Sequence, residues 1–186
     1  VHDEKSMKYI TLLFLLGSSI LGWTQQNIES LQASFPESWM GTWEGTLNIY
    51  GPKGVNQSIP MEVSISEHPD SMRWNWQLTY KGEKEDVRAY ELVEINREKA
   101  HFQIDEKNSI LLDSYLYGNT LSSRFAVDNS LLIVNYSMNV EAEELTFELF
   151  WGSTIEKVET GKEIKENKIT SYPVNTRHQA ILKKSN

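Results

Sequence analysis

Apolar and polar residues alternate along most of the chain with the period of two that is typical of β-strands. In the clearest early case, Trp43, Leu47 and Ile49 fall on one face of a strand, and polar residues fall on the other. Gly41 and Gly45 would let backbone or an aromatic ring approach this strand closely. The pattern predicts a strand with a large aromatic anchor, Trp43, at the start of its apolar face.

Nine further segments show strand-like patterns, and turns rich in Gly, Asn, Asp and Pro separate most of them. The third strand alternates most regularly, with Trp74, Trp76 and Tyr80 on one face. In the fourth, Glu91 shares a face with apolar residues, and residues 154–168 read as a charged loop or hairpin. The expected strands cover residues 39–50, 59–65, 72–81, 87–95, 100–105, 110–117, 121–127, 131–140, 145–151 and 171–182.

A meander of about ten strands with one apolar face should close on itself, because closure removes the unpaired edges. We therefore predict an all-β fold, an antiparallel up-and-down β-barrel of about eight to ten strands, as a single domain over residues 25–186. A barrel of this size can hold one small ligand. A two-sheet sandwich is the alternative, but the short connections disfavour its long crossovers. A short N-terminal helix over residues 27–35 would cap the barrel before Pro36.

Residues 1–24 are expected to be a leader with a secretory signal peptide. Lys8 supplies a positive charge, residues 10–16 are almost entirely apolar, and small residues follow as far as Thr24. The apolar run is short for a membrane-spanning helix. We therefore expect export to a periplasm, the cell surface or the outside of the cell, with no membrane insertion after the signal is removed.

Charge and composition narrow the classes of function. The chain has 18 Lys and Arg against 26 Asp and Glu, a formal net charge of −8. Nucleic acid is not an expected partner, because phosphate backbones require a basic surface. There is no Cys nucleophile, metal-ligand spacing, phosphate-binding glycine loop or nucleophile elbow in the sequence. An enzyme is therefore a weaker expectation than a binding protein, and no resident cofactor is expected.

The first strand resembles a known group of barrels. Its run Gly41-Thr42-Trp43 matches the Gly-x-Trp signature that opens the first strand of lipocalins and their barrel relatives. The longer run, with Gly45, Tyr50 and Pro52, is similar to the first strand of nitrobindins, which are small haem-binding barrels. Both resemblances imply a lipocalin-like (calycin) barrel.

Each resemblance also implies a role for a residue near the end of the chain. In lipocalins a late Arg packs across the first-strand Trp, and Arg177 is the best match, with Arg124 as the alternative. Gly41, Trp43 and Arg177 would then be structural. In nitrobindins the haem ligand is a His at or just before the closing strand, which implies that His178 could bind haem iron. Otherwise His178 would hydrogen-bond within the barrel wall or at its mouth.

The aromatic residues of the apolar faces suit a flat or apolar ligand, although an ordinary packed core has the same pattern. Glu91 could act as a base or orient a ligand, unless its strand turns it outward. We expect a small, largely apolar ligand inside the barrel. Haem on His178, an isomerase or hydrolase built on Glu91 or tyrosines, and a fully packed interaction module are the alternatives. The expected ligand-binding residues are Trp74, Trp76, Tyr80, Glu91, Phe102, Phe125, Phe147 and His178.

Overall fold

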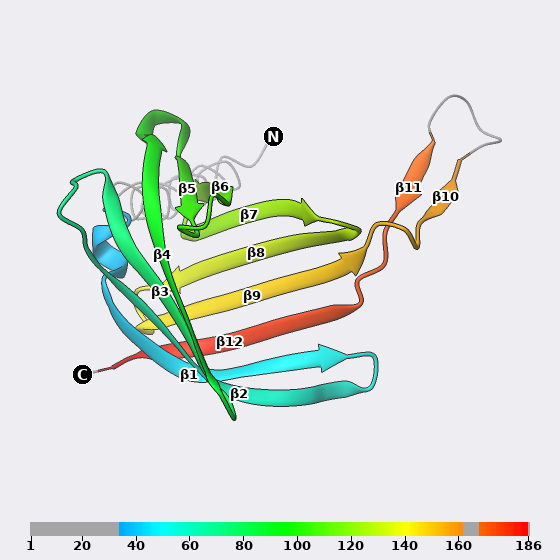
Figure 1. Cartoon of the computed structure of the whole chain (residues 1–186), viewed down its shortest axis with the longest axis horizontal. Coiled ribbons are helices and arrows are strands. Elements are labelled where there is room, and N and C mark those ends of the chain that lie inside the picture. Colours follow the sequence, from blue (N-terminus) through cyan, green and yellow to red (C-terminus); the bar gives the residue numbers. More distant parts are fainter. Residues whose placement is uncertain (1–33, 162–167, 186) are drawn as a thin grey trace, which may run out of the picture.

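The computed structural model describes residues 34–161 and 168–185. Within these residues, ten antiparallel strands close into one barrel, and two short strands form a separate hairpin (Figure 1). The predicted all-β barrel is therefore confirmed. The leader expected over residues 1–24, and most of the helix expected over residues 27–35, lie outside the described residues. No helix in the described ranges has the length and apolar character needed to cross a membrane.

The strands follow one another around the barrel in chain order, except that the hairpin of β10 and β11 interrupts the sequence between β9 and β12. The barrel strands are β1 (Gly41–Gly51), β2 (Gly54–Glu67), β3 (Arg73–Lys81), β4 (Glu85–Asn96), β5 (His101–Asp105), β6 (Leu111–Tyr117), β7 (Thr120–Val127), β8 (Ser130–Asn139), β9 (Glu144–Ser153) and β12 (Thr176–Lys184). The hairpin strands are β10 (Val158–Thr160) and β11 (Ile169–Ser171), and the 3₁₀ helices are η1 (Glu37–Trp39) and η2 (Arg97–Lys99).

The barrel closes where β1 pairs with β12. The register runs antiparallel from Trp43 opposite Lys184 to Tyr50 opposite Arg177. Gly45 permits this approach, because a Cβ atom there would lie only 2.5 Å from the carbonyl oxygen of Ile181. The close backbone contact expected at this glycine is therefore present.

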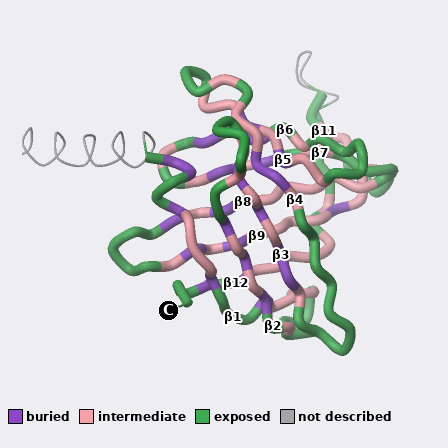
Figure 2. Tube along the Cα trace, turned by 60° about the vertical axis from the view of Figure 1, so that its left-hand side comes forward, coloured by how far each residue is buried: buried purple, intermediate pink, exposed green. Residues whose placement is uncertain are grey.

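Alternation places one side-chain set inside the barrel along every strand. Figure 2 shows buried segments alternating with less buried ones along β3. Ser114 and Ser123, two polar residues inside the barrel, hydrogen-bond each other through their hydroxyls at 2.6 Å. This pairing satisfies buried polar groups that would otherwise cost free energy. The buried apolar residues of the barrel strands include Leu47, Met61, Val63, Ile65, Trp74, Trp76, Leu78, Leu92, Phe102, Ile104, Leu116, Leu121, Met138, Leu145, Phe147, Ala180 and Leu182.

One end of the barrel is closed by aromatic packing. Helix η1 and the residues before it bring Phe35 and Trp39 against the interior, and both are fully buried. Phe35 meets Phe102 edge-to-face with ring centroids 5.0 Å apart, and Trp39 lies 6.4 Å from Trp76. Edge-to-face contacts of this kind are a favoured aromatic geometry. The indole N–H of Trp43 donates to the carbonyl oxygen of Trp39 at 2.9 Å, which fixes η1 over this end.

The inner face of β4 differs from the prediction. The sequence favoured the face that contains Val87 and Ile95, yet these side chains are 49% and 44% exposed. Pairing with β3 places Leu92 opposite Trp74 and Tyr90 opposite Trp76, so the other face points inward. Both faces of this strand carry apolar residues, and the aromatic partners on β3 decide between them.

The partner expected for Trp43 is also different. Arg177 lies seven residues along β12 from Lys184, beside Tyr50, and its guanidinium sits over the rings of Tyr50 and Phe150. Lys184 instead places its ammonium 5.5 Å from the centre of the Trp43 ring. The prediction for Arg177 was wrong because antiparallel pairing puts the last residues of β12, rather than the first, next to Trp43.

The β10–β11 hairpin connects the end of β9 to the start of β12 and projects away from the barrel (Figure 1). Its first strand, β10, lies within residues 154–168, which were expected to be a loop or hairpin, and β11 follows that stretch. Glu159 pairs with Lys157 in its own segment and with Lys168 on the other side of the hairpin. These are exposed ion pairs, which contribute little to stability.

Replacing Trp43 by Ala should lower the free energy of unfolding by about 3–5 kcal/mol, the range for removing a buried aromatic side chain. Trp43 is only 3% exposed, and the variant also removes the hydrogen bond that holds η1. Chemical denaturation followed by far-UV circular dichroism measures the change. Lys184→Ala is the control and should cost much less, since it removes only the exposed cation. An unchanged midpoint for Trp43→Ala would contradict the packing of the closed end.

Candidate ligand-binding site

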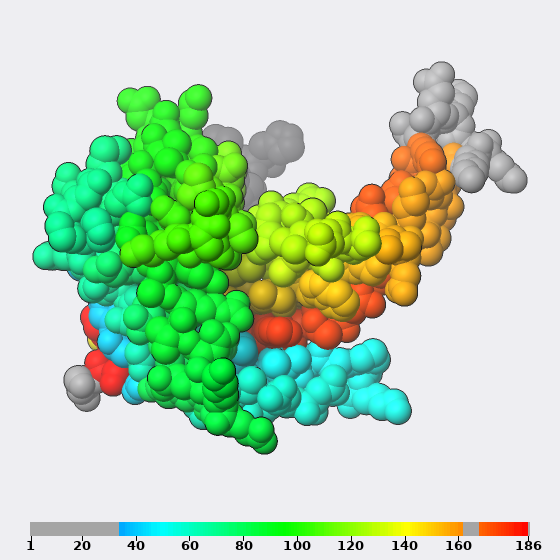
Figure 3. Space-filling model, viewed as in Figure 1, coloured from blue at the N-terminus to red at the C-terminus, as the bar shows by residue number. Residues whose placement is uncertain are grey.

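The barrel interior is hollow at the end opposite η1. Two connected lobes lie there, of about 480 and 200 Å³. Tyr80, Arg88 and Leu149 line both lobes, so the two form one cup. Figure 3 shows the molecule hollowed between the green wall of β3 and β4 and the yellow-to-red wall of β8, β9 and β12. Together the lobes have the size of a small-molecule site, about 300–1,000 Å³.

The smaller lobe is the inner, mostly apolar part of the cup. Its floor is formed by Tyr136 and Phe147, whose ring centroids are 5.3 Å apart. Tyr136 also meets Trp76 edge-to-face at 5.1 Å, so the floor rests on the aromatic cluster of the closed end. The aliphatic and phenyl side chains of this lobe are Leu78, Ile104, Leu112, Phe125, Leu132, Val134, Phe147 and Leu149.

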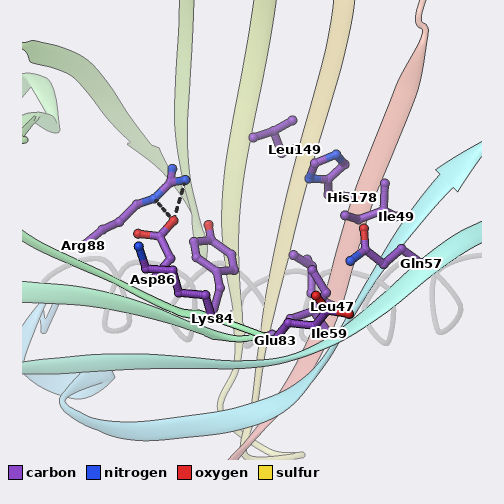
Figure 4. Close-up of a pocket in the computed structure, with 12 residues that line it drawn as sticks. Leu47, Ile49, Gln57, Ile59, Glu83, Lys84, Asp86, Arg88, Leu149 and His178 are labelled. Carbon is purple, nitrogen blue, oxygen red and sulfur yellow. Dashed lines mark hydrogen bonds and ion pairs between the residues drawn. The ribbon is translucent and has the colours of Figure 1, made fainter.

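The larger lobe is the outer part of the cup, and its lining is mixed, with charged and polar side chains beside the aliphatic Leu47, Ile49, Ile59 and Leu149. In Figure 4, the Arg88–Asp86 pair lies on one side of it, and His178, Ile49 and Gln57 lie on the opposite side. The guanidinium of Arg88 donates from Nε and Nη2 to Oδ2 of Asp86, at 3.1 and 3.0 Å. The turn between β3 and β4 forms the rim with Gly82, Glu83 and Lys84.

Arg88 keeps its charge inside the cup. Burial alone would lower the pKa of Arg88, but the hydrogen bond to Asp86 and the neighbouring tyrosines outweigh it, so the pKa is raised. The guanidinium also sits 5.0 Å from the centre of the Tyr80 ring. The cup therefore presents a fixed cation whose remaining N–H groups can donate to a ligand.

The tyrosine hydroxyls of the cup remain protonated at neutral pH. Burial raises the pKa of Tyr80 to about 12 and raises the pKa of Tyr136 as well. Neither phenol is thus suited to act as a base near pH 7, whereas both can donate a hydrogen bond.

His178 faces the outer lobe from β12, between Ile49 of β1 and Leu149 of β9. Burial lowers the pKa of His178, so the imidazole is neutral at pH 7. A neutral imidazole can donate from one nitrogen and accept, or ligate a metal, with the other.

The residues predicted to bind a ligand fall into three groups. Tyr80, Phe125, Phe147 and His178 line the cup. The remaining aromatic side chains, Trp74, Trp76 and Phe102, are buried in the packed interior and line neither lobe.

Glu91 forms the third group, because it lies on the outer face of β4, opposite Asn75 of β3. Its carboxylate contacts Nη1 of Arg73 at 2.6 Å and Nζ of Lys107 at 2.7 Å. The pKa of Glu91 is lowered by hydrogen bonds from Lys107 and Arg73. An inward role as a base or ligand contact is therefore wrong for Glu91. Its position is that of a structural ion-pair centre.

Sequence reasoning missed Arg88, Asp86 and Tyr90 as parts of the cup. All three follow from the face of β4 that turns inward, with Tyr90 and Leu92 as its apolar members. The sequence contains this second alternation. Asp86, Arg88, Tyr90 and Leu92 occupy every second position of the segment, and the polar pair lies nearest the turn.

The described residues do not assemble a metal site, since no group of three or more His, Asp or Glu among them could hold an ion. The cup has polar groups at its mouth and apolar groups inside. Such an arrangement can hold and orient a small molecule.

Comparison with known proteins agrees with the fold. The solved structure of an S-type phycobiliprotein lyase, CPES, from Guillardia theta resembles this chain with a TM-score of 0.53. The likeness covers 83% of this chain and 92% of that chain, at 9% sequence identity. At this identity it shows a shared lipocalin-like barrel and nothing finer. No protein-family model and no curated protein sequence matches the chain.

Glu91→Gln should lower stability by about 1–2 kcal/mol at neutral pH, because it removes the charge that holds Arg73 and Lys107. The pKa of Glu91 is lower in the folded protein than in the unfolded chain, so this contribution is complete above the unfolded pKa. It is lost as the pH falls through the folded pKa. The melting temperatures of wild type and variant, measured from pH 7 down to pH 3, should therefore converge in acid. A gap that stays constant with pH would show that the carboxylate charge is not involved.

Proposed function

We propose that this chain is an exported protein that holds a small, largely apolar ligand inside its barrel. The observation that carries the proposal is the cup, in which a mostly apolar inner lobe of about 200 Å³ adjoins an outer lobe of about 480 Å³ that adds charged and polar side chains to an aliphatic lining. Export is supported by the signal-like residues 7–24.

The two lobes favour an amphiphilic ligand. The apolar part would lie on Phe147 and Tyr136, and the burial of its surface would drive binding. The polar part would remain in the outer lobe, within reach of Arg88, Tyr80 and His178. Fatty acids, retinoid-like molecules and pigments meet this description. The phycobiliprotein lyase of the same fold adds open-chain tetrapyrroles such as biliverdin to the candidates.

Haem is the second candidate, because His178 presents a neutral imidazole to the larger lobe. Haem bound there would supply an iron centre for diatomic gases such as nitric oxide. Within this chain, His178 would hold the iron, and Arg88 and Lys84 would be the cations available for the haem carboxylates.

Leu149→Trp should weaken ligand binding at least tenfold, because Leu149 lines both lobes and an indole there would fill their junction. We expect wild type to bind a suitable amphiphile in the micromolar range, about −8 kcal/mol. Calorimetric titration with long-chain fatty acids, retinoids and biliverdin measures the affinity of wild type and its loss in the variant.

Phe150→Trp is the matched control, because Phe150 is the next residue of β9, points outward and stacks with Arg177. It should bind as wild type does. If no titrated compound binds wild type, or if both variants bind equally well, the cup is not a ligand site.

If His178 ligates the iron, His178→Ala should change the Soret band of the haem-loaded protein to that of free haem. Absorbance and magnetic circular dichroism spectra of the reconstituted protein report the ligation. Gln179→Ala, one residue along β12 and on the outer face, is the control and should leave the spectrum unchanged. A wild-type spectrum identical to that of free haem excludes this candidate while leaving the amphiphile proposal standing.

A further inference from the structure

The outer face of the barrel carries a continuous row of polar side chains across five neighbouring strands. Strand register aligns Tyr115 of β6 with Ser122 of β7, then Asn135 of β8, Glu148 of β9 and Gln179 of β12. These strands lie side by side in the barrel (Figure 1). Neighbouring strands are about 4.8 Å apart, so a chain molecule lying across them would meet one polar side chain at each such step.

Aromatic rings stand at the β6 end of this row. Tyr115 is 37% exposed, and Tyr117, two residues further on the same face, is 70% exposed. Their rings are nearly parallel, 19° apart in orientation, with centroids at 6.4 Å. The more exposed Tyr117 ring, and the part of the Tyr115 ring that its neighbours leave uncovered, offer surface on which a ligand can stack.

A neighbouring strand holds these rings in place. The imidazole of His101 on β5 stacks on Tyr115, with centroids 4.7 Å apart and an angle of 8°. Nε2 of His101 in turn contacts Oδ1 of Asp113 at 2.7 Å, and Gln103 donates to the same oxygen. Tyr115 is therefore ordered before any ligand arrives, which lowers the entropic cost of binding.

The polar row is likewise preorganised by its own hydrogen bonds. The hydroxyl of Ser122 donates to Oδ1 of Asn135 at 2.7 Å, and Gln179 donates to Oε1 of Glu148. Arg177 also binds Glu148, so the carboxylate charge is compensated. The Asn135 amide N–H groups and the second Glu148 oxygen add donors and acceptors to this surface.

We propose that Tyr115, Tyr117 and this row form a binding surface for a neutral oligosaccharide. Sugar rings present flat C–H faces that stack on aromatic rings, and their hydroxyls pair with amides, hydroxyls and carboxylates. The acidic net charge of the chain disfavours nucleic acid and other polyanions.

The test is binding of defined glycans by the full chain. Hexasaccharides of β-1,4-glucan, β-1,3-glucan, β-1,4-mannan and α-1,4-glucan are titrated by calorimetry, and the parent polysaccharides are used in affinity electrophoresis. We expect at least one to bind. The double variant Tyr115→Ala, Tyr117→Ala should weaken that binding about tenfold or more, because it removes both stacking faces. Tyr117→Phe keeps the ring and should bind nearly as well as wild type.

Two controls separate this surface from the rest of the protein. Tyr172→Ala removes an exposed tyrosine between β11 and β12, outside the row, and should leave binding unchanged. Leu149→Trp fills the cup and should also leave it unchanged, since the two surfaces lie on opposite sides of the barrel wall. Failure of all four hexasaccharides to bind wild type overturns the proposal. So does equal binding by the double tyrosine variant, provided that its melting temperature matches wild type.

Discussion

The pairing of the first barrel strand with the last is the constraint on which the other features of this protein depend. Until β1 meets β12, the sheet has two open edges and its apolar face is exposed to water. Gly45 is central to this closure, since a side chain there would collide with the backbone at Ile181. Once the sheet closes, the inward residues of ten strands share one interior. The size of the side chains at each end of the barrel then decides whether that end is packed or hollow.

The two ends of that interior are filled very differently. At the η1 end, large rings pack together from Phe35 through Trp39 and Trp76 to Tyr136, mostly edge-to-face, and the burial of their apolar surface stabilises the fold. At the other end, the inward positions carry Arg88 and His178 together with shorter aliphatic side chains. Charged and polar residues are tolerated there because the cup opens to water and Asp86 compensates the guanidinium. The stability of one end thus permits a cavity at the other.

Much of the fold could be predicted from the sequence, because the period-two alternation and the short turns are local signals. The burial of Trp43 and the cavity positions of Tyr80 and Phe147 follow directly from them. Depth along the barrel is not a local property. The alternation predicts that Trp76 points inward. It does not predict that η1 covers Trp76 and so keeps it out of the cup.

Two failures had a common cause in long-range register. In β4 both faces contain apolar residues, so only pairing with the tryptophans of β3 selects Leu92 over Glu91 for the interior. In β12, antiparallel pairing with β1 places Lys184 opposite Trp43. Arg177 lies seven residues earlier in the strand, opposite Tyr50. Neither pairing register can be read from the amino-acid composition of the strand concerned. The resemblance to lipocalins identified the strand that pairs with β1 but misplaced the residue within it.

The same alternation gives the wall of β6 to β12 two independent surfaces. On β9, Leu149 lines the cup while Glu148 belongs to the outer polar row. On β12, His178 faces inward and Gln179 faces outward. Because successive side chains of a strand point to opposite sides, adjacent residues can be substituted to alter one surface and leave the other intact. Each strand of this wall therefore contributes one set of side chains to the interior and another to the outer face. The backbone pairing of the strands also keeps the inner and outer faces in a fixed relation to each other.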